Sequence, residues 1–73
     1  MSQLQLPTLQ VFLTQHDLLK YYDGMVAYGA DNIADWLAFT EEEFSAAVTS
    51  DDIAMAPGHI IRFKNAVKEL KHH

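Results

Sequence analysis

Residues that could take part in catalysis are few in this chain. His16 and His59 could each transfer a proton, and Glu41, Glu42 and Glu43 are three consecutive carboxylates. A nucleophilic mechanism needs a cysteine or serine beside such a base, yet the chain has no cysteine and no evident serine arrangement of this kind. Nor does the sequence contain a glycine-rich phosphate loop or a set of residues with metal-ligand spacing. We therefore predict a non-enzymatic protein that uses no cofactor and no metal.

The charged residues form a clearer pattern along the chain than the candidate catalytic residues do. The acidic residues of the middle of the chain are Asp31, Asp35, Glu41, Glu42, Glu43, Asp51 and Asp52, and no lysine or arginine lies among them. Four of the five basic residues follow later, and these are Arg62, Lys64, Lys68 and Lys71. Two surfaces of opposite charge could associate head to tail between molecules. Charge runs are also typical of solvated helix faces, and the helix dipole favours bases near a C-terminus, so the pattern leaves both interpretations open.

Length and composition indicate one small globular domain. Seventy-three residues with 49% hydrophobic and 21% charged side chains suit a single core. The absence of cysteine favours an intracellular, cytoplasmic location, and no apolar run reaches the roughly 20 residues of a membrane span. The net charge of −5 argues against general nucleic-acid binding. We expect residues 1–6 to form an extension, 7–71 the folded domain and 72–73, two histidines, a candidate tag remnant.

Capping residues and helical spacing predict two helices in the first thirty residues. A proline followed by Thr8 marks the start of the first helix, which ends near residues 15–16. Asp17 is expected to cap a second helix that ends at Gly29. Gly24, inside this second helix, costs roughly 1 kcal/mol relative to alanine. We therefore expect another segment of the chain to pack closely against it.

The third and fourth helices are predicted mainly by their capping residues. Residues 31–32 can cap a very short helix whose apolar side chains are Ile33, Trp36 and Leu37. Thr40 and Glu43 then form a capping box, in which each side chain accepts a hydrogen bond from the backbone amide of the other residue. The fourth helix that begins there should end near Val48.

A polar turn at residues 49–52 follows the fourth helix, and residues 49–54 are expected to form an extra turn before a long helix closes the chain. Pro57 opens this helix, whose inward face carries Ile60, Phe63, Val67 and Leu70. The aromatic residues expected in the core are Tyr21, Tyr22, Trp36 and Phe63. No strand periodicity is present, so we predict an all-α, five-helix bundle with a long C-terminal helix.

In order and spacing, these features resemble the sterile alpha motif (SAM) domain over nearly the whole chain. The matching residues are Phe12, Leu13, Leu18, Tyr21, Met25, the turn Gly29-Ala30-Asp31, Leu37, Phe39, the segment Thr40-Glu41-Glu42-Glu43-Phe44, Gly58, His59, Phe63, Val67 and Leu70. The connection from Phe44 to Gly58 is longer than the family's usual turn. The resemblance implies a non-enzymatic interaction module within a larger signalling or scaffold protein.

The resemblance also implies two binding surfaces. SAM domains commonly join a mid-loop surface, built from the central helices, to an end-helix surface at the start of a neighbour's fifth helix. Here the implied mid-loop residues are Asp31, Asp35, Glu41, Glu42, Asp51 and Asp52, and the implied end-helix residues are Gly58, His59, Ile61, Arg62 and Lys64. The partner would be another SAM domain, in the same or a different protein, or another kind of protein.

The end-helix surface departs from the family pattern, because Ile60 and Ile61 stand where a basic residue is common. Ile60 lies three positions before Phe63 and is expected to turn inward. Ile61 aligns with Lys64 and with Lys68 on the outer face of the helix. The pattern favours a contact with an apolar centre and a basic rim, although a single exposed apolar residue is also ordinary.

RNA-hairpin binding is the alternative function, because some SAM domains hold a hairpin loop with a basic patch around the fifth helix. In this chain the patch would consist of Arg62, Lys64, Lys68 and Lys71. Four basic residues on an otherwise acidic domain provide little attraction for phosphates. Protein association is therefore the favoured function.

Overall fold

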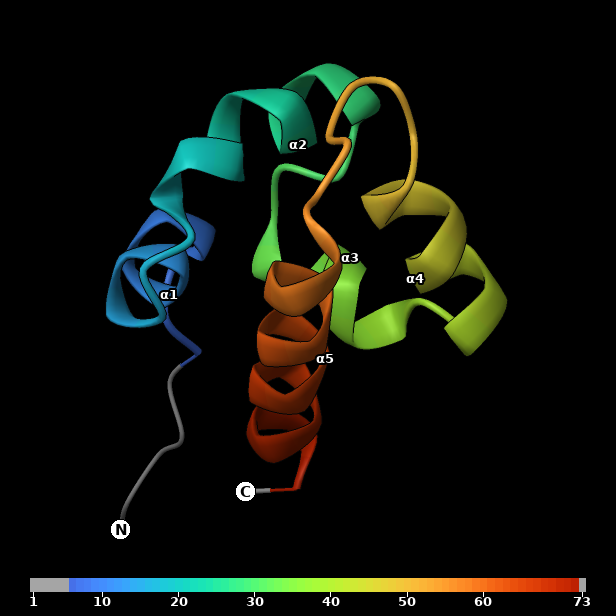
Figure 1. Cartoon of the computed structure of the whole chain (residues 1–73). Helices are drawn as coiled ribbons and strands as arrows, with labels where there is room; N and C mark the ends of the chain where they lie inside the picture. Colours follow the sequence, from blue (N-terminus) through green and yellow to red (C-terminus); the bar gives the residue numbers. More distant parts are fainter. Residues whose placement is uncertain (1–5, 73) are drawn as a thin grey trace, which may run out of the picture.

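The computed structural model describes residues 6–72, which form five α-helices and one 3-10 turn and contain no strand. The elements are α1 (Leu9–Gln15), η1 (Leu19–Tyr21), α2 (Tyr22–Tyr28), α3 (Ile33–Ala38), α4 (Glu41–Val48) and α5 (Pro57–Lys71). Figure 1 shows α5 running through the centre, with α1 on one side and α4 on the other. The predicted all-α, five-helix bundle is confirmed. Most of the predicted extension (residues 1–5), and His73 of the candidate tag remnant, lie outside the described residues.

Most helix ends follow the capping chemistry of the sequence. The Thr8 hydroxyl accepts a hydrogen bond from the Val11 amide at 3.2 Å and begins α1. Before α3, the Asn32 side chain caps the helix and Asp31 does not. The predicted capping box of Thr40 is complete, with hydrogen bonds of 3.1 and 2.9 Å. Gly29 ends α2 with a φ of 101°, a conformation that glycine adopts without strain.

Asp17 does not cap the second helix, and this prediction was wrong. Its φ of 59° places it in the left-handed region, where it ends α1. The Leu18 amide donates to the carbonyl of Leu13 at 2.8 Å and the Asp17 amide donates to the carbonyl of Thr14 at 3.2 Å, which together form a Schellman motif. A 3-10 turn follows, so α2 begins only at Tyr22. Aspartate is favoured both at helix starts and in left-handed turns, and the sequence did not separate the two.

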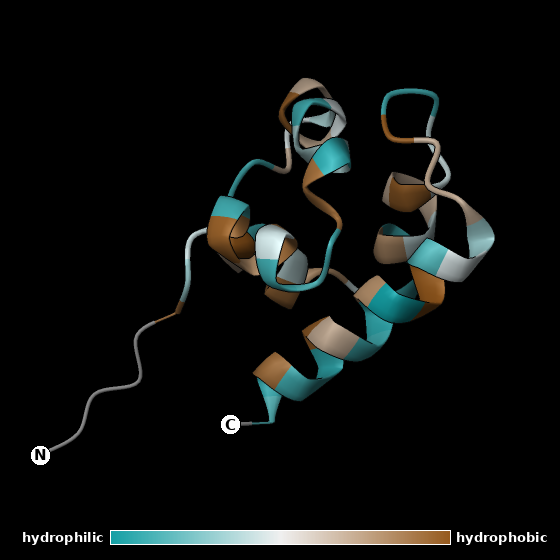
Figure 2. Ribbon diagram, turned by 60° about the vertical axis from the view of Figure 1, so that its left-hand side comes forward, coloured by the Kyte–Doolittle hydropathy of each residue, from teal (hydrophilic) through white to brown (hydrophobic). Residues whose placement is uncertain are grey.

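The core is centred on Trp36 of α3 and Phe63 of α5, which are both fully buried. Their ring centroids lie 4.9 Å apart with the planes at 72°, an edge-to-face arrangement. The indole N–H of Trp36 donates to the Ala30 carbonyl at 2.9 Å, so its burial leaves no polar atom unpaired. Tyr21 and Tyr22, predicted in the core, are only half-buried. Figure 2 shows hydrophobic and hydrophilic residues alternating along α5, as expected for a helix with one buried face.

The connection between α4 and α5 forms the predicted extra turn. The Ser50 carbonyl accepts from the amides of Ile53 and Ala54 at 3.2 and 2.6 Å. Ile53 is buried and anchors the turn, while Asp51 and Asp52 are exposed at its tip. In Figure 1 the connection lies beside α2.

Gly24 of α2 is the point where this connection approaches most closely. A Cβ atom at Gly24 would overlap the carbonyl oxygen of Asp52 and would lie 3.2 Å from the Ile53 Cα. The prediction that another segment packs closely against Gly24 is therefore confirmed. Glycine is required here for space, since its φ is not positive. Among the described residues, no helix is long and apolar enough to cross a membrane.

Candidate interaction surfaces

The six acidic residues of the implied mid-loop surface fall into separate groups. Asp51 and Asp52 are exposed on the turn that follows α4, whereas Glu41 and Glu42 are exposed at its beginning. The eight residues of α4 rise about 12 Å along the helix axis, so the two pairs lie at opposite ends of this helix. The remaining two precede or belong to α3, with Asp31 exposed and Asp35 half-buried. A single partner contact would therefore use a subset of them.

The implied end-helix residues occupy the first two turns of α5. Gly58, Ile61 and Arg62 are exposed, while His59 and Lys64 are half-buried. Ile61 is the most exposed large hydrophobic residue among residues 6–72, at 63%. Ile60 is partly buried against the core, as expected from its position three residues before Phe63. An apolar side chain therefore stands out from the start of α5, as the sequence predicted.

One ion pair joins residues that were predicted on opposite surfaces. The Lys64 ammonium lies 3.3 Å from a carboxylate oxygen of Glu41, which connects α5 to the first turn of α4 within one molecule. Both side chains remain substantially exposed, at 44% and 82%. Exposed pairs of this kind contribute about 0–1 kcal/mol to stability. Both side chains can therefore still contact a partner molecule.

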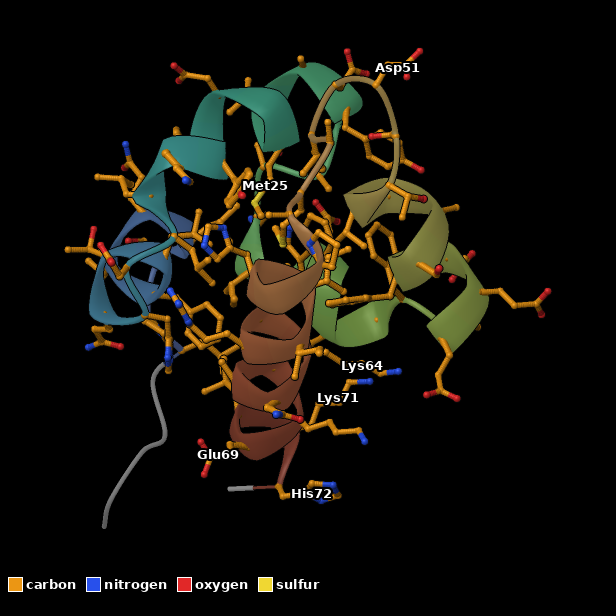
Figure 3. The ribbon with its side chains drawn as sticks, in the orientation of Figure 1. Met25, Asp51, Lys64, Glu69, Lys71 and His72 are labelled. Atoms are coloured by element: carbon orange, nitrogen blue, oxygen red, sulfur yellow. The ribbon has the colours of Figure 1, made fainter. Side chains whose placement is uncertain are left out.

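The four basic residues proposed for RNA do not share one side of α5. Arg62 and Lys64 are two positions apart and so project about 200° apart around the helix. Arg62 faces α1, where its guanidinium donates to the His16 carbonyl at 3.2 Å. Lys64, Lys68 and Lys71 instead line a hollow beside α3 and α4. Figure 3 shows Lys64 and Lys71 extending from the same side of α5, while Asp51 lies at the far end of the molecule.

A hydrogen-bond network at the start of α5 was not foreseen from the sequence. The Tyr21 hydroxyl lies 2.6 Å from His59 Nδ1 and 3.2 Å from the Ala56 amide nitrogen. The hydroxyl oxygen accepts a hydrogen bond from the Ala56 amide and forms a second hydrogen bond with the His59 imidazole. This assigns His59 a structural role in joining η1 to α5. The contact spans 38 residues, and no local pattern indicates it.

Replacing Tyr21 by phenylalanine tests this network. The variant Tyr21→Phe removes both hydrogen bonds and leaves the Ala56 amide without its protein partner, so we expect a loss of about 1–2 kcal/mol in the free energy of unfolding. Urea denaturation followed by circular dichroism measures the loss. Tyr28→Phe is the matched control, because Tyr28 is exposed and its change should be nearly neutral. Equal stability of the two variants would contradict the structural role.

The hollow beside α3 and α4 is a small groove of about 200 Å³. Its lining includes the aromatic residues Trp36, Phe39 and Phe44, together with the three lysines of α5. A larger hollow of about 470 Å³ lies between α1 and the end of α5, and Leu6, the first described residue, forms part of its edge. The described residues contain no group of three or more His, Cys, Asp or Glu side chains that could hold a metal ion.

The five-helix bundle with a long last helix is the architecture that the resemblance to SAM domains implies. Comparison with protein families refines this class, because residues 1–73 match the NAB conserved region 1 (NCD1) SAM domain. The chain belongs to this family. Comparisons with individual curated proteins and with solved structures found no significant match. The resemblance to SAM domains is thus confirmed, and family membership supports a general role in protein interaction.

Proposed function

We propose that the domain associates with a second SAM-type domain through two different surfaces. The acidic turn of one molecule, at Asp51 and Asp52, contacts the start of α5 of the next molecule, around Ile61. The exposure of Ile61 carries this proposal, because 63% of a large apolar side chain stands in water beside basic residues. The acidic turn is likewise exposed, and its opposite charge complements Arg62 and Lys64.

The apolar contact is expected to contribute more affinity than the charges. Burying a whole isoleucine side chain is worth about 1.5–3 kcal/mol, whereas each exposed ion pair contributes about 0–1 kcal/mol. The charges chiefly set orientation and association rate. Because the two surfaces differ, a bound pair of molecules retains one free surface of each kind, and the contacts propagate into a filament unless the rotation closes a ring.

Sedimentation velocity over a wide concentration range tests this association. We expect species that grow with concentration and shrink as salt rises, because part of the attraction is between exposed charges. Ile61→Asp and Asp52→Lys should each reduce the chain to a monomer. An equimolar mixture of these two variants retains one intact contact and should stop at a dimer.

Glu69→Lys is the matched control for charge. Glu69 is exposed near the end of α5, and its replacement changes the net charge by the same amount as Asp52→Lys. We expect this control to associate like the unmodified chain. A monomer at every concentration and salt, or equal behaviour of Asp52→Lys and Glu69→Lys, would overturn the proposal.

A further inference from the structure

The groove between α5 and the α3–α4 segment has an aromatic floor. Trp36 is fully buried beneath it, and Phe39 and Phe44 meet the indole edge-on, with ring centroids 5.1 and 5.5 Å away. Phe39 is only half-buried, so part of an aromatic ring borders the groove. Val67 adds an apolar contribution from α5. The groove therefore offers an apolar surface that is already formed by the core.

The size of the groove limits what it can hold. Small-molecule and cofactor sites commonly enclose about 300–1,000 Å³, which exceeds the roughly 200 Å³ present here. A space of this size suits one apolar side chain that projects from a peptide. The adjoining backbone of such a peptide would run along the rim.

The rim is basic, although the protein is acidic. Lys64, Lys68 and Lys71 lie four and three positions apart, so they share one side of α5, and all three line the groove. Against them stands one lining carboxylate, that of Glu41, so the rim carries three positive charges and one negative charge, a net +2. The helix dipole explains a preference for bases at the end of α5, but it does not explain Lys64 in the middle of the helix.

From this geometry we propose that the groove binds an acidic peptide segment of another protein, with one apolar side chain inserted against Phe39 and carboxylates paired with Lys68 and Lys71. The acidic turn of a second copy of this chain does not fit the description. Ile53, the apolar residue next to that turn, is 94% buried in the core of its own molecule, so it cannot enter the groove of another molecule. This binding is separate from the self-association proposed above: its paired residues are Lys68 and Lys71, and Lys64 is the one residue that borders both sites.

Fluorescence anisotropy of the full chain with a short fluorescein-labelled peptide tests the proposal. The peptide carries one leucine flanked by aspartates and glutamates. We expect saturable binding that weakens with salt, and that is lost when the leucine becomes serine or when the acids become amides. The double variant Lys68→Glu/Lys71→Glu should weaken binding about tenfold or more, because two attractions become repulsions. Trp36, the single tryptophan, borders the groove and provides a second signal through its emission.

Lys20→Glu/Arg62→Glu is the matched control, since it changes the net charge equally but away from the groove, with Lys20 in η1 and Arg62 on the side of α5 that faces α1. This control should bind the peptide within about twofold of the unmodified chain, because distant exposed charges are screened. Absence of binding at millimolar protein, or equal weakening by both double variants, would overturn the proposal. Ile61→Asp should leave peptide binding intact, which separates failure of this site from failure of self-association. An RNA hairpin that displaces the peptide while showing the same dependence on Lys68 and Lys71 would also overturn it.

Discussion

Gly24→Ala is expected to lower the free energy of unfolding by about 2–3 kcal/mol and the melting temperature by about 10–20 °C. The added methyl group would overlap the Asp52 carbonyl oxygen, and the neighbouring atoms are backbone, so no side chain can rotate away. The turn must move instead, although Ile53 and Met55 anchor it in the core. Alanine's better helix propensity offsets roughly 1 kcal/mol of the cost of the overlap, which leaves the net loss of about 2–3 kcal/mol. Thermal and urea denaturation followed by circular dichroism measure the effect.

Gly58→Ala provides the control for this prediction. No atom lies within 4 Å of a Cβ atom built at Gly58, and the residue is in the first turn of α5. The same substitution should therefore be neutral or stabilising by up to about 1 kcal/mol. If Gly24→Ala were as stable as Gly58→Ala, the close contact between α2 and the α4–α5 connection would not exist in solution.

Phe63→Ala is expected to have the largest effect, a loss of about 3–5 kcal/mol. Phe63 is fully buried, and its ring centroid lies 4.9 Å from that of Trp36 and 5.3 Å from that of Phe44. Its removal leaves a cavity where α1, α3 and α4 meet α5. A domain of this length has about 4–11 kcal/mol of stability in total, so the variant loses a large share of it. Urea titration monitored by Trp36 fluorescence reports the shift of the midpoint.

Ile61→Ala, two positions earlier on the same helix, is the control for core packing. Because Ile61 is largely exposed, its truncation should change stability by no more than about 0.5 kcal/mol. The same variant should weaken self-association, which is the effect expected of a surface contact. A comparable loss of stability in both variants would mean that α5 is rotated differently about its axis, with Ile61 packed in the core.

The helix pattern was predictable because its signals are local. The caps at Thr8 and Thr40, and the end of α2 at Gly29, use atoms only a few residues away. The exception, Asp17, shows the limit of such signals, because one residue type suits both a helix start and a left-handed turn. Gly24 was informative for another reason. Glycine lowers the stability of a helix, so its presence inside one indicated a role elsewhere, and here it leaves space for the backbone of Asp52.

The arrangement of the charged and polar side chains depended on how the helices pack. Sequence alone was sufficient to separate an acidic middle from a basic end and to identify Ile61 as exposed. It did not indicate that Glu41 pairs with Lys64, or that Arg62 faces away from Lys68 toward α1. The contacts of Arg62 with His16 and of Tyr21 with His59 span 46 and 38 residues. Their partners are set by the rotation of α5 against its neighbours, and the packing around Phe63 fixes that rotation.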